Sequence, residues 1–519
     1  MSNSTAQAAP PIPHDSSTEQ LGTSAAPVNP ERVGKPRSLR VPAALAVIVA
    51  VGALLRVVPL RSVWLDEAIS IGQARLPYLT MLHDLRSADV HPPLWGSVLW
   101  LDIRLFGDGP LAVRIPSLVI GTLSIPLVYL AARELYDRRA GVAAALLIAV
   151  SPVAVWYSAE ARMYAFYIFW SLLAVLGQAR AIRRGGWLDW GLFAVASAGL
   201  VYTHYFSLLQ LCTQHLVFAA IVIRRGLKRE QMARRLLVGW LSATVVTLVL
   251  LLPLVPYAGE QVGDFIGSSA GAAGSSTPTG GDGSRFISLY VILANLTWAM
   301  WGYHSDAAME QLVALWPVGM LVILLLLGRG RSRSTALLVS LVIVPFALAY
   351  LLGTKQRSFF ELRYFISVLP PLLILAARAA TGWLRTTTAR ATAVAAIALT
   401  MIVGLGDQQL NSSNPRLYDY NGAFRLVNEE ARPGDVILFA PGYLEVLVRY
   451  YHPAVTAVPI RGGVPLPAQH GGRTFLMASY LDNPDNASLV GQALAQLDTG
   501  GRTVQRVEHR ENVTIWILQ

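Results

Sequence analysis

Long apolar runs recur along this chain, and they constrain its fold more than any other feature of the sequence. A helix needs about 20 mostly apolar residues to cross the hydrocarbon core of a bilayer, and about eleven stretches meet that requirement. They lie near residues 41–60, 111–132, 140–157, 163–181, 188–204, 205–223, 236–257, 309–328, 334–353, 364–380 and 391–406. With only 14% charged residues in 519, the chain has too little polar surface for a soluble protein of this size. We therefore expect a mainly α-helical, polytopic membrane bundle.

The distribution of Lys and Arg between the runs indicates how the chain crosses the membrane. Cytoplasmic connections of membrane proteins carry an excess of these residues. Here every second connection is basic, and all of these fall on the side of the N-terminus: Arg133, Arg138 and Arg139; Arg183 and Arg184; the run from Arg224 to Arg235; Arg329, Arg331 and Arg333; Arg385 and Arg390. We predict a multi-pass protein of the cell (plasma) membrane, with residues 1–40 as a disordered cytoplasmic tail.

Three segments do not fit the pattern of ordinary spans or loops. The stretches Leu94 to Phe106 and Phe286 to Tyr303 are too short or too polar to span, so we expect interfacial or re-entrant helices there. Residues 267–284 are rich in Gly and Ser, which predicts a mobile outer loop. Arg56 lies late in the first run, close enough to the interface for its side chain to snorkel.

After residue 406 the composition changes to that of a small soluble domain, so we expect a transmembrane module over 41–406 and an extracytoplasmic α/β domain over 407–519. β-rich apolar runs alternate there with helical patterns. The predicted strands are Val436–Ala440, Thr474–Ala478, Val504–Val507 and Val513–Leu518, and the predicted helices are Asn421–Glu430, Tyr443–Tyr450 and Ala487–Leu497. An odd number of spans places this domain outside. Asp482 and Asp485 lie in a turn-like segment, where solvated carboxylates are usual.

Charge and cysteine content exclude two classes of function. The net charge of +11 comes from Lys and Arg in short clusters between apolar runs, where they set membrane topology, so we predict no nucleic-acid partner. Cys212 is the only cysteine and lies inside an apolar run. No intrachain disulfide, thiolate metal site or cysteine redox motif is therefore available.

The first outer loop, residues 61–93, is dense in titratable groups. Asp66 and Glu67 lie in W-L-D-E-A, and Asp89 and His91 lie in D-V-H-P-P-L. His83 and Asp84 lie in the same loop. An acidic pair at a helix end can be no more than a hydrated helix stop, but so many titratable groups in a chain with so few indicate a functional site.

The later outer connections place cations in the same compartment. Glu160, Arg162 and Tyr164 lie between two spans, and Lys355, Arg357 and Arg363 precede another. Local ion pairs or snorkelling explain each of them equally well when it is taken alone. His204, at the end of a run, is of a kind that is more often structural than catalytic.

Outward carboxylates together with outward cations suit the transfer of a sugar from a phosphate leaving group. A carboxylate takes the proton of the acceptor, and cations hold the charge that grows on the departing phosphate. Nucleotide-activated sugars are kept in the cytoplasm, so an outward site needs a donor carried in the bilayer. A lipid-linked sugar meets that need.

At these residues the sequence resembles the GT-C superfamily of membrane glycosyltransferases, specifically glycosyltransferase family 39 with the protein O-mannosyltransferases and the lipid A aminoarabinose transferases. The resemblance covers roughly residues 41–377. It is carried by W-L-D-E-A, D-V-H-P-P-L, Y-S-A-E-A-R-M-Y, T-H-Y-F and E-L-R-Y-F-I-S-V-L-P-P, in this order. It implies a catalytic acid in the first outer loop, a polyprenyl-phosphate sugar donor and inversion of the anomeric centre.

The resemblance makes Asp66 the general base, with Glu67 beside it as the second catalytic residue. Neighbouring helix residues point about 100° apart, so the two are expected to differ in role. Arg162 and Arg363, with Lys355 or Arg357, are the candidates for the lipid phosphate. The predicted substrate-binding residues are Asp89, His91, Glu160, Arg162, Tyr164, His204, Lys355, Arg357 and Arg363.

We predict no cofactor and no metal. Oxygen ligands from Asp66, Glu67 and Asp89 could hold a divalent ion, but the neighbouring cations could neutralise a phosphate without one. The acceptor stays open between an extracytoplasmic glycan, lipid or protein, because the C-terminal pattern differs from the β-trefoil inserts of eukaryotic O-mannosyltransferases.

Two other functions compete with this one. A transporter or flippase of a lipid-linked sugar would also need many spans, but transporters place polar groups near the bilayer midplane on broken helices, often in two related halves. Here the charges lie at outer helix ends and no internal repeat is visible. The third possibility is a non-catalytic scaffold that displays the C-terminal domain.

Overall fold

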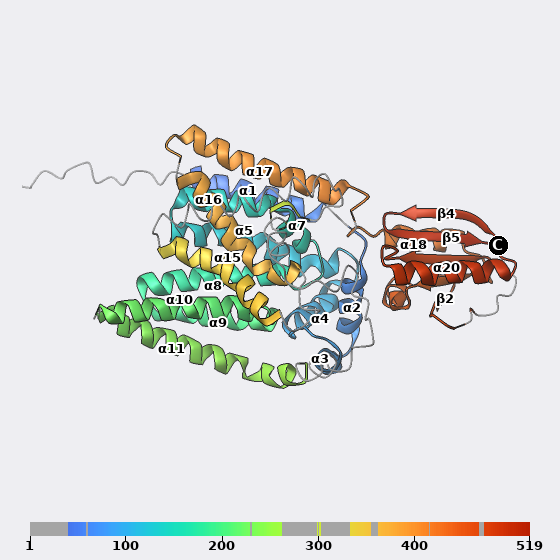
Figure 1. Ribbon diagram of the computed structural model, residues 1–519, viewed down its shortest axis with the longest axis horizontal. Helices are drawn as coiled ribbons and strands as arrows, with labels where there is room; N and C mark the ends of the chain where they lie inside the picture. The colour runs from blue at the N-terminus through green and yellow to red at the C-terminus, as the bar shows by residue number, and fades with distance from the viewer. Residues whose placement is uncertain are drawn as a thin grey trace, which may run out of the picture. The chain divides into compact units, whose positions relative to one another are not determined.

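The computed structural model describes residues 40–58, 61–228, 231–261, 298, 300–302, 333–353, 362–382, 384–414, 416–464, 466 and 472–519, and the chain from Pro42 onward forms one compact unit. It is mainly helical (Figure 1). The long helices are α1 (Arg40–Val57), α5 (Ile115–Leu135), α6 (Arg138–Val150), α8 (Tyr164–Arg184), α9 (Trp187–Thr203), α10 (Ser207–Leu227), α11 (Gln231–Leu251), α15 (Arg333–Gly353), α16 (Leu369–Gly382) and α17 (Thr387–Leu410).

Seven helices in the described residues are long and apolar enough to cross a membrane, and a bent pair raises this number to eight. The predicted count of about eleven is not confirmed among the described residues. The run at 309–328, residues 267–284, the N-terminal tail and most of Phe286 to Tyr303 lie outside the described residues. Helices α8, α9 and α11 are neighbours in Figure 1, and α5 packs against both α6 and α8. The multi-pass membrane architecture is confirmed.

The bent pair consists of α6 and α7 (Pro152–Ser158), which meet at 59°. Ser151 accepts a hydrogen bond from the amide of Ala154, and Pro152 follows it in the first turn of α7. Proline fits there because the first turn of a helix has no partner for its N–H group. The bend brings the end of α7 to the residues that carry the candidate site.

Arg56 holds this bend from inside the protein, which shows that the snorkelling prediction was wrong. Its side chain is buried and donates to the carbonyls of Ile148 at 3.0 Å and Ala149 at 3.1 Å, and to Ser158 Oγ at 3.1 Å. The end of α6 has carbonyls without helical partners, and a guanidinium satisfies them. The position of Arg56 near the end of its apolar run did not reveal that the carbonyls at the end of α6 need a hydrogen-bond donor.

Three short helices follow α1: α2 (Leu65–Arg75), α3 (Tyr78–Ala88) and α4 (Leu94–Phe106). The 13 residues of α4 are too few to span a bilayer, and their bounds match the predicted short helix. Pro77 and Pro93 occupy the N-cap positions of α3 and α4, so the prolines separate the three helices. Helix α2 packs against α3 and α4, and a 3-10 turn, η2 (Ala112–Arg114), precedes α5.

The C-terminal residues form a five-stranded sheet in the order β2-β1-β3-β5-β4. The elements, in addition to α18 (Tyr420–Glu430), α19 (Glu445–Tyr451) and α20 (Pro484–Thr499), are β1 (Val436–Ala440), β2 (Thr456–Pro459), β3 (Thr474–Ser479), β4 (Val504–Arg510) and β5 (Val513–Leu518). Strands β1, β2 and β3 are parallel, and β5 pairs antiparallel with β3 and β4. The predicted small α/β domain is confirmed, and β2, a four-residue edge strand ending in proline, was missed.

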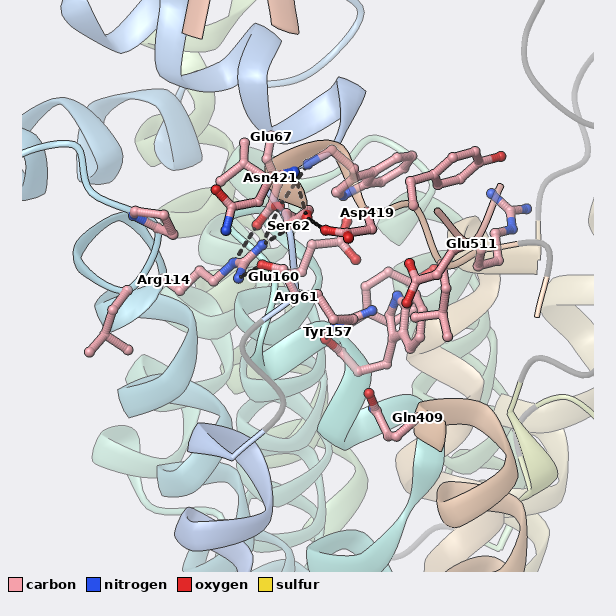
Figure 2. Close-up of a pocket in the computed structure, with 18 of the residues that line it drawn as sticks. Arg61, Ser62, Glu67, Arg114, Tyr157, Glu160, Gln409, Asp419, Asn421 and Glu511 are labelled. Atoms are coloured by element: carbon pink, nitrogen blue, oxygen red, sulfur yellow. Dashed lines mark hydrogen bonds and ion pairs between the residues drawn. The ribbon is translucent and has the colours of Figure 1, made fainter. Parts of the chain in front are cut away.

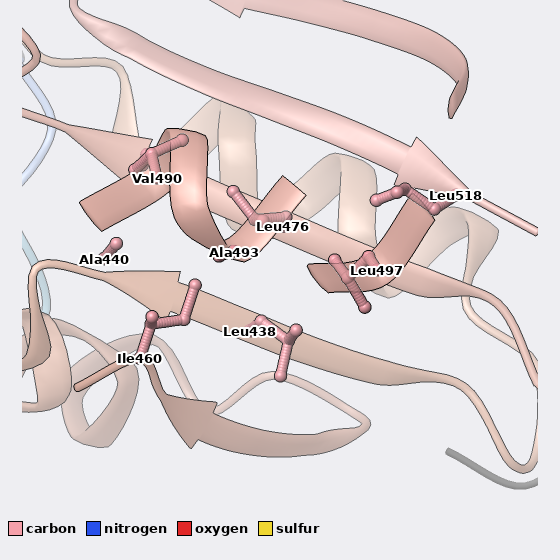
Figure 3. Packing of buried hydrophobic residues seen from close by; sticks show 9 residues of the cluster. Leu438, Ala440, Ile460, Leu476, Val490, Ala493, Leu497 and Leu518 are labelled. Carbon is pink, nitrogen blue, oxygen red and sulfur yellow. The ribbon is translucent and has the colours of Figure 1, made fainter. Parts of the chain in front are cut away.

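One face of this sheet packs against α20 (Figure 3). Leu438, Leu476 and Leu518 from the strands meet Val490 and Leu497 of the helix. All five side chains are buried, and alternate residues of β1 and β3 face the helix, as the two-residue period of a strand requires. The sheet therefore has its own hydrophobic core.

Candidate active site

Glu67 is fully buried and bound on both oxygens. Arg114 donates to Oε1 at 2.8 Å and to Oε2 at 2.6 Å, and the amide of Ala161 donates to Oε1 at 2.6 Å. The amide of Trp64 closes the first turn of α2 on Oε2 at 3.3 Å. A bidentate arginine pair is the strongest form of this interaction. Glu67 therefore ties α2 to η2 and to the turn after α7.

Asp66, the preceding residue, faces other partners. Its Oδ2 accepts a hydrogen bond from Arg363 at 2.8 Å, and Arg162 lies 3.8 Å from the same oxygen. Burial by itself raises the pKa of Asp66, but the guanidiniums of Arg363 and Arg162 outweigh it and hold that pKa below its ordinary value. Within the described chain these contacts all involve Oδ2, so Oδ1 is left for another partner.

The two arginines come from distant parts of the chain. Arg162 lies in the turn between α7 and α8 and is fixed by a hydrogen bond to Ser70 Oγ at 2.8 Å. Arg363 lies in η4 (Leu362–Val368), a 3-10 segment before α16. Long-range packing therefore brings together a carboxylate and two cations that the sequence could place only in the same predicted compartment.

Asp89 and His91 form a second, self-contained pair. Asp89 Oδ1 lies 2.6 Å from His91 Nδ1 and also accepts from the amide of His91 at 3.0 Å. Although burial raises the pKa of Asp89, His91 lowers it well below its ordinary range. Gln73 donates to Oδ2 at 3.2 Å, and Gln261 donates to the carbonyls of both residues. The carboxylate thus orients the imidazole, whose second nitrogen is available for a ligand.

His204 lies among aromatic rings next to this pair. Its ring centroid is 5.3 Å from that of Tyr167, 5.8 Å from that of His91 and 6.2 Å from that of Tyr164. Burial, with the charges of His91 and the arginines, lowers the pKa of His204 well below its ordinary value, so this imidazole is neutral. Its Nδ1 accepts from the amide of Phe206 at 3.2 Å.

Glu160 differs from the other carboxylates of the site. Glu160 is 2% exposed, and its Oε1 has no hydrogen-bond partner among the described residues. Burial raises the pKa of Glu160 to about 7, and the negative charge of Glu67 adds to the rise. A buried carboxyl with this pKa exchanges its proton near neutral pH.

A cavity of about 670 Å³ opens beside these residues. Figure 2 shows Arg61, Glu67, Arg114 and Glu160 on one part of its wall and Asp419 and Glu511 on another. Asp66 does not line the cavity. Its neighbours Trp64 and Glu67 do, and so does Arg363, which pairs with Asp66. The α/β domain therefore completes a cavity whose other wall belongs to the helical module.

Direct hydrogen bonds hold the two walls together. Tyr451 Oη donates to the carbonyl of Val63 at 3.0 Å, and Ser62 Oγ donates to Asp419 Oδ1 at 3.2 Å while accepting from the amide of Asn421 at 3.0 Å. Ser62 and Val63 immediately precede α2. Helix α2 is thus anchored by the C-terminal domain as well as by Arg114.

The structure brings together most of the predicted site residues. Asp66, Arg162 and Arg363 are in contact, and Asp89, His91, Tyr164 and His204 form an adjoining group, whereas Glu160 lines the cavity. Lys355 and Arg357 lie outside the described residues. His83 is exposed, and Asp84 accepts from Gln73 at 3.2 Å.

Sequence reasoning missed Arg114 and the residues of the C-terminal domain. Arg114 is a lone cation at the predicted outer end of an apolar run, against the positive-inside bias, and that position was the available signal. Asp419 and Glu511 are separated by almost the whole C-terminal domain and carried no such signal. Within the described ranges no three His, Cys, Asp or Glu residues are grouped so as to hold a metal ion, and the metal-independence of the reaction stays a prediction.

Comparisons with known proteins agree with this architecture. Residues 90–257 match the family model described as dolichyl-phosphate-mannose-protein mannosyltransferase. The structure of ArnT from Cupriavidus metallidurans bound to undecaprenyl phosphate is 15% identical with a TM-score of 0.54, and the match covers 92% of this chain and 98% of that chain. No curated protein matches in a sequence search.

A second similar structure is the archaeal oligosaccharyltransferase AglB from Archaeoglobus fulgidus in complex with an inhibitory peptide and a dolichol-phosphate. It is 13% identical with a TM-score of 0.52, and the match covers 87% of this chain and 70% of that chain. At these identities the likenesses establish the fold.

Proposed function

We propose that this chain belongs to the GT-C superfamily of membrane glycosyltransferases and moves a monosaccharide from a polyprenyl-phosphate donor to an acceptor on the outer side of the cell membrane. The observation that carries the proposal is the contact of Asp66 with Arg363 and Arg162. An ionised carboxylate thus lies beside two guanidiniums, at the end of the helical module that we assign to the outer side of the membrane. ArnT was solved with undecaprenyl phosphate and AglB with a dolichol-phosphate, which supports a donor of this class.

The reaction follows from the roles these groups can take. The acceptor hydroxyl attacks the anomeric carbon of the sugar, and Asp66 Oδ1 accepts the hydroxyl proton as the new glycosidic bond forms. The bond between the anomeric carbon and the phosphate oxygen breaks, and polyprenyl phosphate leaves from the opposite face, which inverts the anomeric centre. Arg363 and Arg162 bind the phosphate and take up its growing charge.

The low pKa of Asp66 fits this role. The two guanidiniums keep the carboxylate ionised throughout the neutral range. When the leaving phosphate gains charge, it competes with Asp66 for the same cations. The carboxylate then loses part of the stabilisation that depresses its pKa and becomes a better proton acceptor at the moment of transfer.

The neighbouring residues position these partners. We assign Glu67 and Arg114 to fixing α2, so that Glu67 acts by positioning Asp66. Asp89 orients His91 toward the acceptor or the sugar, and the neutral His204 with Tyr164 forms the aromatic wall behind them. Lys355 and Arg357 stay candidates for the lipid phosphate.

The orientation of the chain is part of the proposal. With a cytoplasmic N-terminus, α2 and the C-terminal domain lie outside, where a nucleotide sugar is absent and a lipid-linked sugar is present. Membrane-impermeant thiol labelling tests this. A cysteine at exposed Asp485 should react in intact cells, and one at exposed Arg183 should react only after lysis. The opposite pattern would reverse the topology.

The activity is tested with the purified full-length chain in nanodiscs and a panel of polyprenyl-phosphate sugars, with release of polyprenyl phosphate as the readout. We expect Asp66→Asn to lower release by about 10²–10⁴-fold, because it removes the proton acceptor and retains the side-chain shape. The matched control is Asp108→Asn, which removes an exposed outer carboxylate paired with Arg75 at 2.7 Å. Folded protein that releases no phosphate from any donor, but moves lipid-linked sugars across vesicles, would identify a flippase instead.

A further inference from the structure

We propose that the cavity shared by the helical module and the C-terminal domain binds the acceptor, and that this acceptor is a neutral, hydroxyl-rich glycan of more than one sugar unit. The inference rests on the proposed function, since it assigns the second substrate of the same site. The cavity, at about 670 Å³, lies within the size range of sites that bury whole ligands. Its wall includes Arg363, the cation that contacts Asp66, so an acceptor bound here adjoins the reacting groups.

The wall carries as many carboxyl as guanidinium groups, which favours a ligand without a strong charge of its own. Four arginines line the cavity, and four carboxylates oppose them: Arg61, Arg114, Arg363 and Arg416 with Glu67, Glu160, Asp419 and Glu511. Arg114 is neutralised by Glu67 in a buried bidentate pair, and Arg363 by Asp66. An anionic acceptor such as a phosphorylated headgroup would need an excess of unpaired cations, because buried charges require opposite partners.

Polar atoms of the wall that lack hydrogen-bond partners suit a ligand that is rich in hydroxyl groups. Among the described residues, both side-chain atoms of Gln409, Oε1 of Glu160 and Nε of Arg61 are buried and make no hydrogen bond. All three residues line this cavity (Figure 2). Buried polar atoms cost free energy unless they are hydrogen-bonded. An amide, a carboxyl and a guanidinium together offer donors and acceptors, which is the combination that a set of sugar hydroxyls satisfies.

Aromatic rings form the remaining wall. Trp156, Tyr157, Tyr418 and Tyr451 line the cavity, and the guanidinium carbon of Arg61 lies 3.4 Å from the ring centroid of Trp156. Flat rings contact the C–H faces of pyranose sugars, whose hydroxyls point outward to the surrounding polar groups. The wall therefore combines the two kinds of surface that a carbohydrate presents.

A second hollow continues this wall along the C-terminal domain. It measures about 200 Å³, and it shares Tyr418 and Glu511 with the main cavity. Asp482, Asn512 and Tyr480 also line it. Tyr480 and Glu511 have backbone φ values of 56° and 52°. Residues other than glycine adopt such conformations at an energetic cost, and these conformations concentrate at functional sites. Two adjoining hollows indicate an acceptor longer than a monosaccharide.

Direct binding tests this assignment without the need for turnover. The full-length chain in nanodiscs is titrated with manno-, gluco- and galacto-oligosaccharides of one to four units, with uronic acid oligosaccharides of equal length, and with unglycosylated peptides. We expect a neutral series to bind with an affinity that rises with length. Glu511→Gln and Asp482→Asn should each weaken this binding about tenfold, because each removes a charged acceptor of a hydrogen bond. Asp485→Asn, which is exposed in the first turn of α20 and lines neither hollow, is the matched control.

Binding of polyprenyl phosphate to the same samples separates this inference from the proposed function. The acceptor variants should bind the lipid as the unmodified chain does, since they lie away from Arg162. The inference is overturned if no neutral oligosaccharide binds, if the anionic series or a peptide binds better, if affinity is independent of length, or if Asp485→Asn is as damaging as Asp482→Asn. If oligosaccharides bind and no polyprenyl phosphate does, the acceptor site stands and the donor assignment fails.

Discussion

The short helix α2 carries a carboxylate on each of two faces, and the surroundings of these two carboxylates differ. On the inner face, Glu67 is fully buried and four hydrogen bonds occupy both of its oxygens. On the outer face, Asp66 is 21% exposed, and its described contacts leave Oδ1 available. A carboxylate whose two oxygens are both hydrogen-bonded positions the neighbouring residue. A carboxylate with an oxygen that accepts no hydrogen bond can accept a proton from a substrate.

The largest effect on stability is expected from breaking the inner face. Glu67→Gln leaves the buried guanidinium of Arg114 without its counter-charge, which should lower the free energy of unfolding by about 3–5 kcal/mol. Thermal and chemical unfolding in a fixed detergent measures it. The double variant E67M/R114M removes both charges and should recover much of this loss. If Glu67→Gln were as stable as the unmodified chain, Glu67 would not be the anchor of α2.

The next effect is on activity, and it concerns the cation of the outer face. Arg363→Gln should reduce polyprenyl phosphate release by about 10²–10³-fold, since one preorganised group for the departing charge is lost. Arg363 lowers the pKa of Asp66, so in this variant the fall in rate on the acid side should move to higher pH. A pH profile of the residual rate measures this, with Arg363→Lys as the control that retains the charge. An acid limb that does not move would separate Asp66 from the proton transfer.

A third prediction uses Glu160, whose pKa is raised to about 7 by burial and by Glu67. The folded chain then binds a proton that the unfolded chain has already released. The stabilisation by that proton is complete below the ordinary pKa of a glutamate and is lost as pH rises through about 7. Its upper limit is on the order of 3 kcal/mol. Glu160→Gln should therefore flatten the decline in stability between about pH 4.5 and about pH 7, the interval between the two pKa values. The free energy of unfolding, measured across that pH range, tests this prediction. If the variant showed the same dependence of stability on pH as the unmodified chain, the burial of Glu160 would be contradicted.

The smallest effect is expected where α2 ends in solvent. Arg75 in the last turn of α2 lies 2.7 Å from Asp108, and both side chains are at least one-third exposed. Exposed pairs of this kind contribute about 0–1 kcal/mol. Asp108→Asn should lower stability by less than that and leave phosphate release unchanged. A larger loss would mean that Asp108 also supports the hydrogen bond from Tyr450 Oη to its carbonyl, at 3.2 Å.

Much of the fold was predictable because its signals are local. Hydrophobic runs of the right length indicated the helical membrane module, and the bounds of α4, β1 and β5 agree with prediction to the residue. Strand β2 escaped because four residues that end in a proline carry little periodicity. The number of spans was less secure, because α1 and α9 are shorter than the seven candidate spans and the predicted run at 309–328 lies outside the described residues.

The sequence by itself determined that the chain is a helical membrane protein with a small α/β domain, and that its titratable residues concentrate in connections between apolar runs. These properties follow from composition and period, which neighbouring residues fix. Only the tertiary structure decided that Asp66 meets Arg363 across 297 positions, that Glu67 meets Arg114, and that Asp419 and Glu511 close a cavity beside them. The physical reason is that desolvation and ion pairing depend on which distant segments pack together, and the order of residues along the chain does not encode that directly.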